Sequence, residues 1–386
     1  MKILMLLDHE FPPDIRVENE IEALQEKGHE VHVACYTRKG LPEKEIVSQA
    51  IVHRRPISTI LYKSSVAALK FPFYFHFWKN FLNELSKKEK FDAIHAHDLP
   101  MAKVGYEFAQ KHSIPFTLDL HENWPALLRV ATHTQTFLGK LLSTDKQWIE
   151  YELNYCKKAD NIIVVVDEAK ERLSKLGIEP EKIQVVSNTL NFKHFEIPET
   201  KPGPEFFTLL YAGGINKHRG LQYVISGLKY LKKLSKPVRV WILGDGSYLE
   251  ALKQLANDEN VAEMVDFKGW KNYKEMQEYF GMADACLIPH VKNDHTDSTI
   301  PHKLFQYMFA GKPTIASNCA PIERIVNETK CGVIYQFDNP KDFAEKTAEL
   351  LNNQEKLEVF IKNGKQAVEE KYNWEIDKKV LQNIYN

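Results

Sequence analysis

A short segment, residues 297–323, combines the residue types that could hold a phosphate group. Thr299 and Pro301 precede an apolar, helix-forming run, which a glycine and a proline then end. The N-terminus of a helix presents free N–H groups and the positive end of the helix dipole, which suits an anion. Lys303 and Gln306 lie on neighbouring turns of one helix face, so both can contact the same ligand. The segment therefore predicts a phosphate-binding helix.

Two glycine-containing turns elsewhere in the chain could contact the same phosphate. Residues 211–221, YAGGINKHRGL, follow a strand-like segment and include two cations, Lys217 and Arg219. Glycines at such a turn let backbone amides approach a phosphate closely. A plain turn with solvated charges accounts for the same residues, so both interpretations stay open. The second turn, LGDGS at residues 243–247, is a weaker signal because a bare connection explains it equally well.

Short apolar segments alternate with helix-like segments along both halves of the chain. The predicted strands of the first half are residues 2–7, 30–34, 93–96, 116–120, 162–166 and 183–186. Those of the second half are residues 208–211, 239–243, 265–268, 285–289, 314–317 and 332–335. This alternation is typical of parallel sheets with helices on both faces. We therefore predict an α/β fold of two Rossmann-like, doubly wound domains, each binding ligands at the carboxyl ends of its strands.

We place the domain boundary at residues 191–206, which include three prolines and show no periodic pattern. The N-terminal domain then comprises residues 1–190 and the C-terminal domain residues 207–368. A chain of 386 residues exceeds the size at which one hydrophobic core stops growing, so two domains are expected. The last segment, residues 369–386, has a helix-like pattern.

The composition argues against several classes of partner and compartment. The 51 basic and 52 acidic residues give a net charge of −1, without the basic excess expected for a nucleic-acid partner. The five cysteines form no C-x-x-C pair, as expected for reduced core thiols rather than a disulfide or zinc framework. The apolar run at residues 3–7 is too short for a secretory signal, and no segment reaches membrane-spanning length. We therefore expect a cytoplasmic protein with no nucleic-acid partner.

The run KLFQYMFAGKP at residues 303–313, with PIE at 321–323, resembles the donor-binding helix of retaining glycosyltransferases of family 4. The resemblance implies a GT-B fold, in which two Rossmann-like domains face each other across a cleft and the C-terminal helix packs back on the N-terminal domain. It also implies a hexosyl or N-acetylhexosaminyl transferase that acts with retention. Its donor would be a nucleotide-diphosphate sugar, and its acceptor a saccharide or lipid-linked saccharide in surface polysaccharide or glycan synthesis.

The same resemblance assigns the donor contacts to the C-terminal domain. Arg219 is expected to grip the diphosphate as a catalytic residue, and Asp297 to contact the donor sugar as a second one. The remaining residues expected to bind the donor here are Gly213, Gly214, Lys217, Gly244, Lys268, Gly269, Trp270, Ser298, Thr299, Ile300, Pro301, Lys303, Leu304 and Gln306.

Three of these positions depart from the family pattern. Gln306 stands where the family has the glutamate that holds the ribose hydroxyls, and Ser298 replaces the glutamate that touches the sugar. Gly214 replaces an arginine of the diphosphate site. A neutral amide can still hydrogen-bond a ribose diol, although without the stronger charge-assisted bonds of a carboxylate.

In the N-terminal domain, His121 directly follows a predicted strand. A lone histidine is more often structural than catalytic, but the end of a strand faces the ligand crevice in this fold class. The family has a histidine here that touches the donor sugar or the reacting centre, so His121 is the predicted catalytic residue. Asp98 and Glu122 are expected on the acceptor side. Arg16, in a D-x-R-V loop, is expected to face the diphosphate.

Residues 61–90 are unusually rich in aromatic and basic side chains, with six lysines against two glutamates. Such a segment can lie in a membrane interface and attract anionic lipid. Aromatic residues at helical spacing also form ordinary core packing, with the lysines solvating the outer face. Both interpretations stay open, and the first predicts peripheral contact with the inner face of a membrane.

The sequence also bears on metal use and on alternative functions. It contains no D-x-D triplet, the motif with which GT-A enzymes hold a divalent ion on the diphosphate, so we expect no metal and no cofactor. An epimerase or hydrolase of the same fold would use the same donor pocket. A non-catalytic subunit that binds nucleotide sugars is the other alternative, which the unusual Ser298 and Gln306 keep open.

Overall fold

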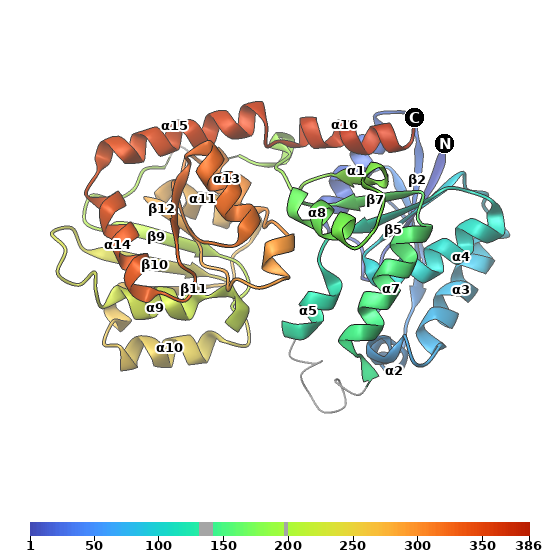
Figure 1. Ribbon diagram of the computed structural model, residues 1–386, viewed down its shortest axis with the longest axis horizontal. Helices are drawn as coiled ribbons and strands as arrows, with labels where there is room; N and C mark the ends of the chain where they lie inside the picture. The colour runs from blue at the N-terminus through green and yellow to red at the C-terminus, as the bar shows by residue number, and fades with distance from the viewer. Residues whose placement is uncertain (131–141, 197–199) are drawn as a thin grey trace. The chain divides into compact units, whose positions relative to one another are not determined.

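The computed structural model describes residues 1–130, 142–196 and 200–386. These residues form two compact units, one of residues 1–187 with 375–386 and the other of residues 188–374. Each unit has one central sheet with helices on both faces, so the predicted α/β class with two doubly wound domains is confirmed (Figure 1). The segment predicted as a linker, 191–206, belongs to the second unit.

The sheet of the first unit has the strand order β3-β4-β2-β1-β5-β6-β7-β8 among the described residues. Only β3 pairs in the antiparallel sense, with β4, and the other neighbours are parallel. The central strand β1 is apolar and almost fully buried, as a strand covered on both faces requires. The strands are β1 Lys2–Leu6, β2 Glu30–Thr37, β3 Lys44–Val47, β4 Ala50–Pro56, β5 Ala93–His97, β6 Phe116–Leu120, β7 Asn161–Val164 and β8 Ile183–Val185.

The helices of the first unit cover both faces of this sheet. They are α1 Ile15–Gln25, α2 Thr59–Lys63, α3 Phe73–Ser86, α4 Ala102–His112, α5 Trp124–Val130, α7 Asp145–Lys158 and α8 Asp167–Lys175, joined by α16 Trp374–Ile384 from the end of the chain. α3, α4 and α7 pack side by side on one face, and Figure 1 shows α1 and α16 on the other. The Gln382 amide of α16 donates to the carbonyl of Ala23 in α1 at 2.8 Å.

The second unit repeats the pattern with the strand order β11-β10-β9-β12-β13-β14, all parallel. The strands are β9 Phe207–Ala212, β10 Val238–Leu243, β11 Val265–Gly269, β12 Ala285–Ile288, β13 Thr314–Ser317 and β14 Gly332–Tyr335. The helices are α9 Leu221–Leu228, α10 Leu249–Asp258, α11 Tyr273–Met282, α12 Lys303–Phe309, α13 Ala320–Thr329, α14 Pro340–Leu351 and α15 Gln354–Glu370. One continuous core joins this sheet to α9, α10 and α14 on one of its faces.

Two glycines let the loops at the carboxyl edge of this second sheet approach one another. Gly244, just after β10, has a φ of +132°, and a Cβ there would lie 2.0 Å from the carbonyl oxygen of Gly213. Gly220, at the start of α9, has a φ of +76°, and a Cβ there would lie 1.6 Å from the carbonyl oxygen of Pro289. Only glycine fits both the conformation and the space. The turns after β9, β10 and β12 therefore meet at one edge of the sheet.

Candidate functional site

Two cations lie where these loops meet. Lys303 begins α12, and its Nζ lies 4.3 Å from the centre of the Tyr211 ring. Its amine would be 2.7 Å from a Cβ at Gly213, so it lies directly against the glycine turn. Arg219 ends a short 3-10 turn, Lys217–Arg219, and its Nη1 lies 3.2 Å from Nε2 of His290. Within the described residues, neither cation contacts a carboxylate.

Among the described residues, the charged group that acts on Lys303 is the second cation, Arg219, and no carboxylate pairs with either side chain. Burial and the nearby charge of Arg219 lower the pKa of Lys303 well below its ordinary value. The same two causes lower the pKa of His218 and of His295 to about 4, so both imidazoles are neutral near pH 7. A half-buried group of like charges is costly unless an anion joins it. The geometry therefore suits an anionic ligand.

A hollow of about 280 Å³ lies beside the glycine turns. Gly213, Gly214 and Gly244 line it, together with Trp270, whose side chain is 73% exposed. An exposed indole next to an anion site offers a flat surface on which a planar base can stack. Lys268, which the family resemblance assigns to the base, pairs with Asp266 at 3.3 Å and is not among the residues that line the hollow, so its contact with the base stays a prediction.

The loop before α12 uses its polar side chains to hold its own shape. Asp297 Oδ1 accepts a hydrogen bond from the backbone N–H of Ala320, at the start of α13, at 2.7 Å. The same oxygen lies 3.1 Å from Lys292 Nζ. The Ser298 hydroxyl donates to the carbonyl of Asp294 at 2.8 Å. These contacts give Asp297 and Ser298 a structural role, while their predicted contacts with a donor sugar stay predictions.

The other residues expected around α12 fall into a buried set and an exposed set. Leu304 and Ile300 are buried in the core, and the Ile300 carbonyl accepts from the Asn188 amide at 3.3 Å. Gln306 is also buried, and its side chain hydrogen-bonds Tyr273, the first residue of α11. Lys217 is exposed next to Arg219. The structure thus brings the predicted donor residues to one edge of the sheet, although only some of their side chains are free of structural contacts.

In the first unit, His121 lies just beyond β6 between two carboxylates. Its Nε2 is 3.2 Å from Asp119 Oδ2, and its Nδ1 is 3.7 Å from Asp98 Oδ2. Burial opposes protonation of the imidazole, but attraction to Asp98 and Asp119 prevails and raises the pKa of His121 to about 10. His121 is therefore a cation near pH 7. Asp98 adopts a φ of +65°, and Glu122 follows His121 directly with a partly exposed side chain.

Arg16 lies in a buried ion pair of the first unit. Its side chain is 5% exposed, with Nη2 3.0 Å from Asp119 Oδ1 and Nε 3.1 Å from Glu20 Oε1. Its Nη1 donates to the carbonyl of Val186 at 3.0 Å. These contacts give Arg16 a structural role in a buried ion pair, while its predicted contact with the diphosphate stays a prediction.

A compact group of titratable side chains surrounds Asp119. The ligand atoms of Glu20, His95, His97 and Asp119 lie within 4.8 Å of one another, a spacing at which a metal ion could bind. Arg16 already contacts both carboxylates, however, so a second cation would meet its repulsion. We interpret the group as a buried ion network that holds Asp119 against His121. His95 and His97 alternate along β5, which places both on one face of the strand, and this spacing in the sequence is the signal from which the group could be predicted.

The aromatic and basic segment 61–90 divides between core and surface. Tyr74, Phe75, Trp78 and Phe81 are buried, which supports the packing interpretation for these positions. Phe71 and Phe73 are 48% and 62% exposed, and their stacked rings are 6.3 Å apart. Across the described residues, none of the helices is both long enough and apolar enough to cross a bilayer.

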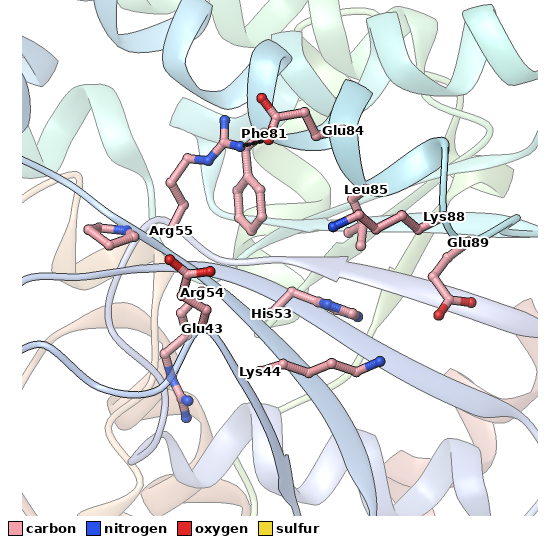
Figure 2. Close-up of a pocket in the computed structure, with 11 residues that line it drawn as sticks. Glu43, Lys44, His53, Arg54, Arg55, Phe81, Glu84, Leu85, Lys88 and Glu89 are labelled. Carbon is pink, nitrogen blue, oxygen red and sulfur yellow. Dashed lines mark hydrogen bonds and ion pairs between the residues drawn. The ribbon is translucent and has the colours of Figure 1, made fainter.

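Figure 2 shows a hollow of about 350 Å³ in the first unit, between β4 and α3. Its charges largely offset one another, because Arg55 pairs with Glu84 and also lies over the ring of Phe81, 4.9 Å from its centre. None of the predicted site residues lines it. We therefore assign it no part in the candidate site.

Comparisons with known proteins identify relatives over nearly the whole chain. The family described as glycosyl transferases group 1 matches residues 192–367, and Glycosyltransferase Family 4 matches residues 15–193. An uncharacterized glycosyltransferase of Methanocaldococcus jannaschii is 26% identical over 100% of this chain and 98% of its own length. A protein of Escherichia coli assigned to colanic acid biosynthesis as a glycosyltransferase is 23% identical over 59% of this chain and 57% of its own.

Solved structures share the fold at low sequence identity. Sucrose-phosphate synthase from Thermosynechococcus elongatus has a TM-score of 0.78 at 16% identity and covers 100% of this chain and 98% of its own. Anabaena HepE in complex with UDP has a TM-score of 0.75 at 13% identity and covers 100% of this chain and 99% of its own.

The raised pKa of His121 predicts a pH dependence of stability. The protonated imidazole contributes stability in full below its ordinary pKa of 6.5, and this contribution is lost as the pH rises through about 10. Denaturant unfolding should therefore show His121→Gln less stable than the wild type at pH 6.5, with the difference shrinking toward pH 10. His76→Gln, which changes an exposed histidine of α3, is the control. A difference that stays constant over this range would contradict the assignment.

Proposed function

Because the chain belongs to the family 4 type of glycosyltransferase with the GT-B fold, we propose that it transfers a sugar from a nucleotide-diphosphate sugar to a saccharide or lipid-linked saccharide. The proposed process is surface polysaccharide or glycan synthesis, in which the Escherichia coli relative is placed by its name. Nucleotide sugars are made in the cytoplasm, and we place the reaction there.

The observation that carries this proposal is the pair of uncompensated cations, Arg219 and Lys303, at the carboxyl edge of the second sheet. When the glycosidic bond of the donor breaks, negative charge develops on the diphosphate. Preorganised cations next to the diphosphate stabilise the leaving group more in the transition state than in the ground state. They would offset the negative charge that a divalent ion offsets in enzymes with a D-x-D motif. We therefore propose a metal-independent reaction.

Binding of the nucleotide would use the hollow beside the glycine turns. The backbone of Gly213 and Gly214 leaves room for phosphate oxygens next to Lys303, and Trp270 offers its ring to the base. HepE of Anabaena has been crystallised with UDP and with UDP-glucose, which makes uridine nucleotides the first candidates to test. Gln306 would hydrogen-bond the ribose as a neutral group.

The first unit would supply the acceptor side of the reaction. We propose that the His121 cation contacts the donor sugar or its phosphate, with Asp119 fixing the ring. No carboxylate is assigned as a nucleophile, so the proposed route is front-face attack by the acceptor hydroxyl, which retains the configuration of the sugar. Detection of a glycosylated acceptor would distinguish this function from an epimerase, a hydrolase or a non-catalytic subunit.

Nucleotide binding should depend on the two cations. A thermal-shift screen with UDP-, GDP-, dTDP- and ADP-sugars should show stabilisation by one nucleotide class, because a ligand that binds only the folded state stabilises it by mass action. Lys303→Gln and Arg219→Gln should each weaken binding of that nucleotide at least tenfold, as a lost charge-assisted hydrogen bond is worth about 1.5–3 kcal/mol. Calorimetric titration measures the affinities.

The matched control for these variants is Lys362→Gln, which removes an exposed lysine of α15. It should bind the nucleotide as the wild type does. A flat thermal response to all four nucleotide classes would count against the proposed function as a whole. Full affinity in Lys303→Gln and Arg219→Gln would show that the diphosphate binds elsewhere.

We also propose that the exposed edge of the aromatic segment contacts a membrane surface. Phe71, Phe73 and Ile60 are exposed near several lysines, a combination that inserts apolar rings while attracting anionic headgroups. Replacing Phe71 and Phe73 by serine should reduce co-flotation with liposomes that contain phosphatidylglycerol. Val359→Ser, at an exposed apolar position of α15, is the control. Equal flotation of the double variant and the wild type would refute membrane contact through this segment.

A further inference from the structure

The largest hollow described in the first unit, about 640 Å³, has no part in the site described above. Its volume is in the range of about 300–1,000 Å³ that small-molecule sites have. Asp8 follows β1, Tyr36 belongs to β2 and Pro100 follows β5, so the hollow lies at the carboxyl edge of the sheet. This is the edge at which open α/β sheets bind their ligands.

The walls of this hollow are mainly aromatic. Trp124 of α5 and Trp148 of α7 form one pair of rings, with centres 5.9 Å apart. Tyr36 and Tyr62 form a second pair, also with centres 5.9 Å apart, and both residues line the hollow. The two pairs come from four separate elements that the fold brings together. They offer flat apolar surfaces next to hydroxyl groups.

One wall of the hollow also carries a carboxylate. Asp8 accepts a hydrogen bond from the Tyr74 hydroxyl, and no basic side chain among the described residues lies within ion-pair distance of it. Burial and the nearby charge of Asp98 raise the pKa of Asp8 well above its ordinary value. Asp8 can therefore exchange hydrogen bonds with a polar ligand group that enters the hollow.

From this combination, we propose that the hollow binds a pyranose ring of the acceptor saccharide. The C–H faces of the ring would stack on the aromatic walls, and its hydroxyl groups would hydrogen-bond the Asp8 carboxyl group. The inference rests on the proposed glycosyltransferase function, because it names the acceptor class of that reaction. It adds a binding residue, Asp8, and a stacking residue, Trp124, to the proposed site.

The polar groups of the hollow favour a saccharide over a hydrocarbon chain. A prenyl or acyl chain would fill the aromatic space but would leave the Asp8 carboxyl group with the Tyr74 hydroxyl in place of the water that it displaces. Burying such a group against hydrocarbon costs several kcal/mol. A sugar ring satisfies both kinds of surface at once, since it has apolar faces and a polar rim.

The hollow also lies close to the predicted reaction centre. Asp98, which is 3.7 Å from His121, is near enough to Asp8 to raise its pKa. Pro100, two residues further along the chain, lines the hollow. A saccharide bound there would have a hydroxyl group within reach of the region around His121.

Saturation-transfer NMR on the full chain can test this site with the methyl glycosides of glucose, mannose, galactose and N-acetylglucosamine. At least one should receive saturation on its ring protons. Asp8→Asn and Trp124→Ala should weaken that binding at least tenfold, while Trp124→Phe keeps an aromatic face and should retain most of it. Tyr230→Ala, at an exposed position of the second unit, is the control and should bind as the wild type does.

Two outcomes would overturn the proposal. One is the absence of saturation transfer to all four glycosides at millimolar concentration, in which case farnesyl phosphate binding that Trp124→Ala removes would assign the hollow to a lipid chain. The other is glycoside binding that Asp8→Asn and Trp124→Ala leave unchanged. The thermal response to nucleotide sugars, measured on the same variants, should stay as in the wild type. A wild type that binds a glycoside but no nucleotide would refute the proposed function and not this site.

Discussion

The arrangement of the second unit depends on positive charge that has no counterion among the described residues. Lys303 and Arg219 lie together at the edge of a sheet, and their neighbouring histidines are held neutral. Keeping two cations close together in a half-buried place costs free energy, which an anionic ligand would return on binding. The glycines of the adjoining turns let these groups come close together. A Cβ at Gly213 would collide with the Lys303 amine, and one at Gly244 would collide with the Gly213 carbonyl.

In the first unit, by contrast, the buried positive charge of Arg16 is paired with carboxylates of the same unit. Arg16 is fully used by Asp119, Glu20 and a backbone carbonyl, so the network beneath His121 is compensated inside the protein. One consequence is that Asp119 is fixed and holds the His121 ring, which is 16% exposed. The end of the chain adds to this packing, since Tyr385, which directly follows α16, lies against His95 with ring centres 6.0 Å apart. The two units thus differ in their electrostatics. The second has two basic side chains, Arg219 and Lys303, that pair with no described carboxylate, and the first holds the His121 cation between Asp98 and Asp119.

The alternation of strands and helices sufficed to predict the α/β class and the two sheets. It missed the hairpin of β3 and β4, because its turn uses Ser48 and Gln49 at positive φ rather than the usual Asn-Gly or Asp-Gly. The pairing of Arg16 with Asp119 could not be predicted, since a charged helix terminus looks alike in sequence whether it is free or paired with a distant residue. The aromatic hollow could not be predicted either, because Asp8, Tyr62 and Trp124 meet only through tertiary packing.

We propose that Lys303 binds the diphosphate of the donor, and burial and the nearby charge of Arg219 lower the pKa of Lys303 in the protein without ligand. Binding of the diphosphate should return that pKa toward its ordinary value, so the protein should take up protons. Calorimetric titration with UDP, and with GDP in parallel, in two buffers of different ionisation enthalpy at pH 9 measures this uptake. We expect proton uptake by the wild type and none by Lys303→Met. Tight binding without proton uptake, or equal uptake by both proteins, would contradict the account.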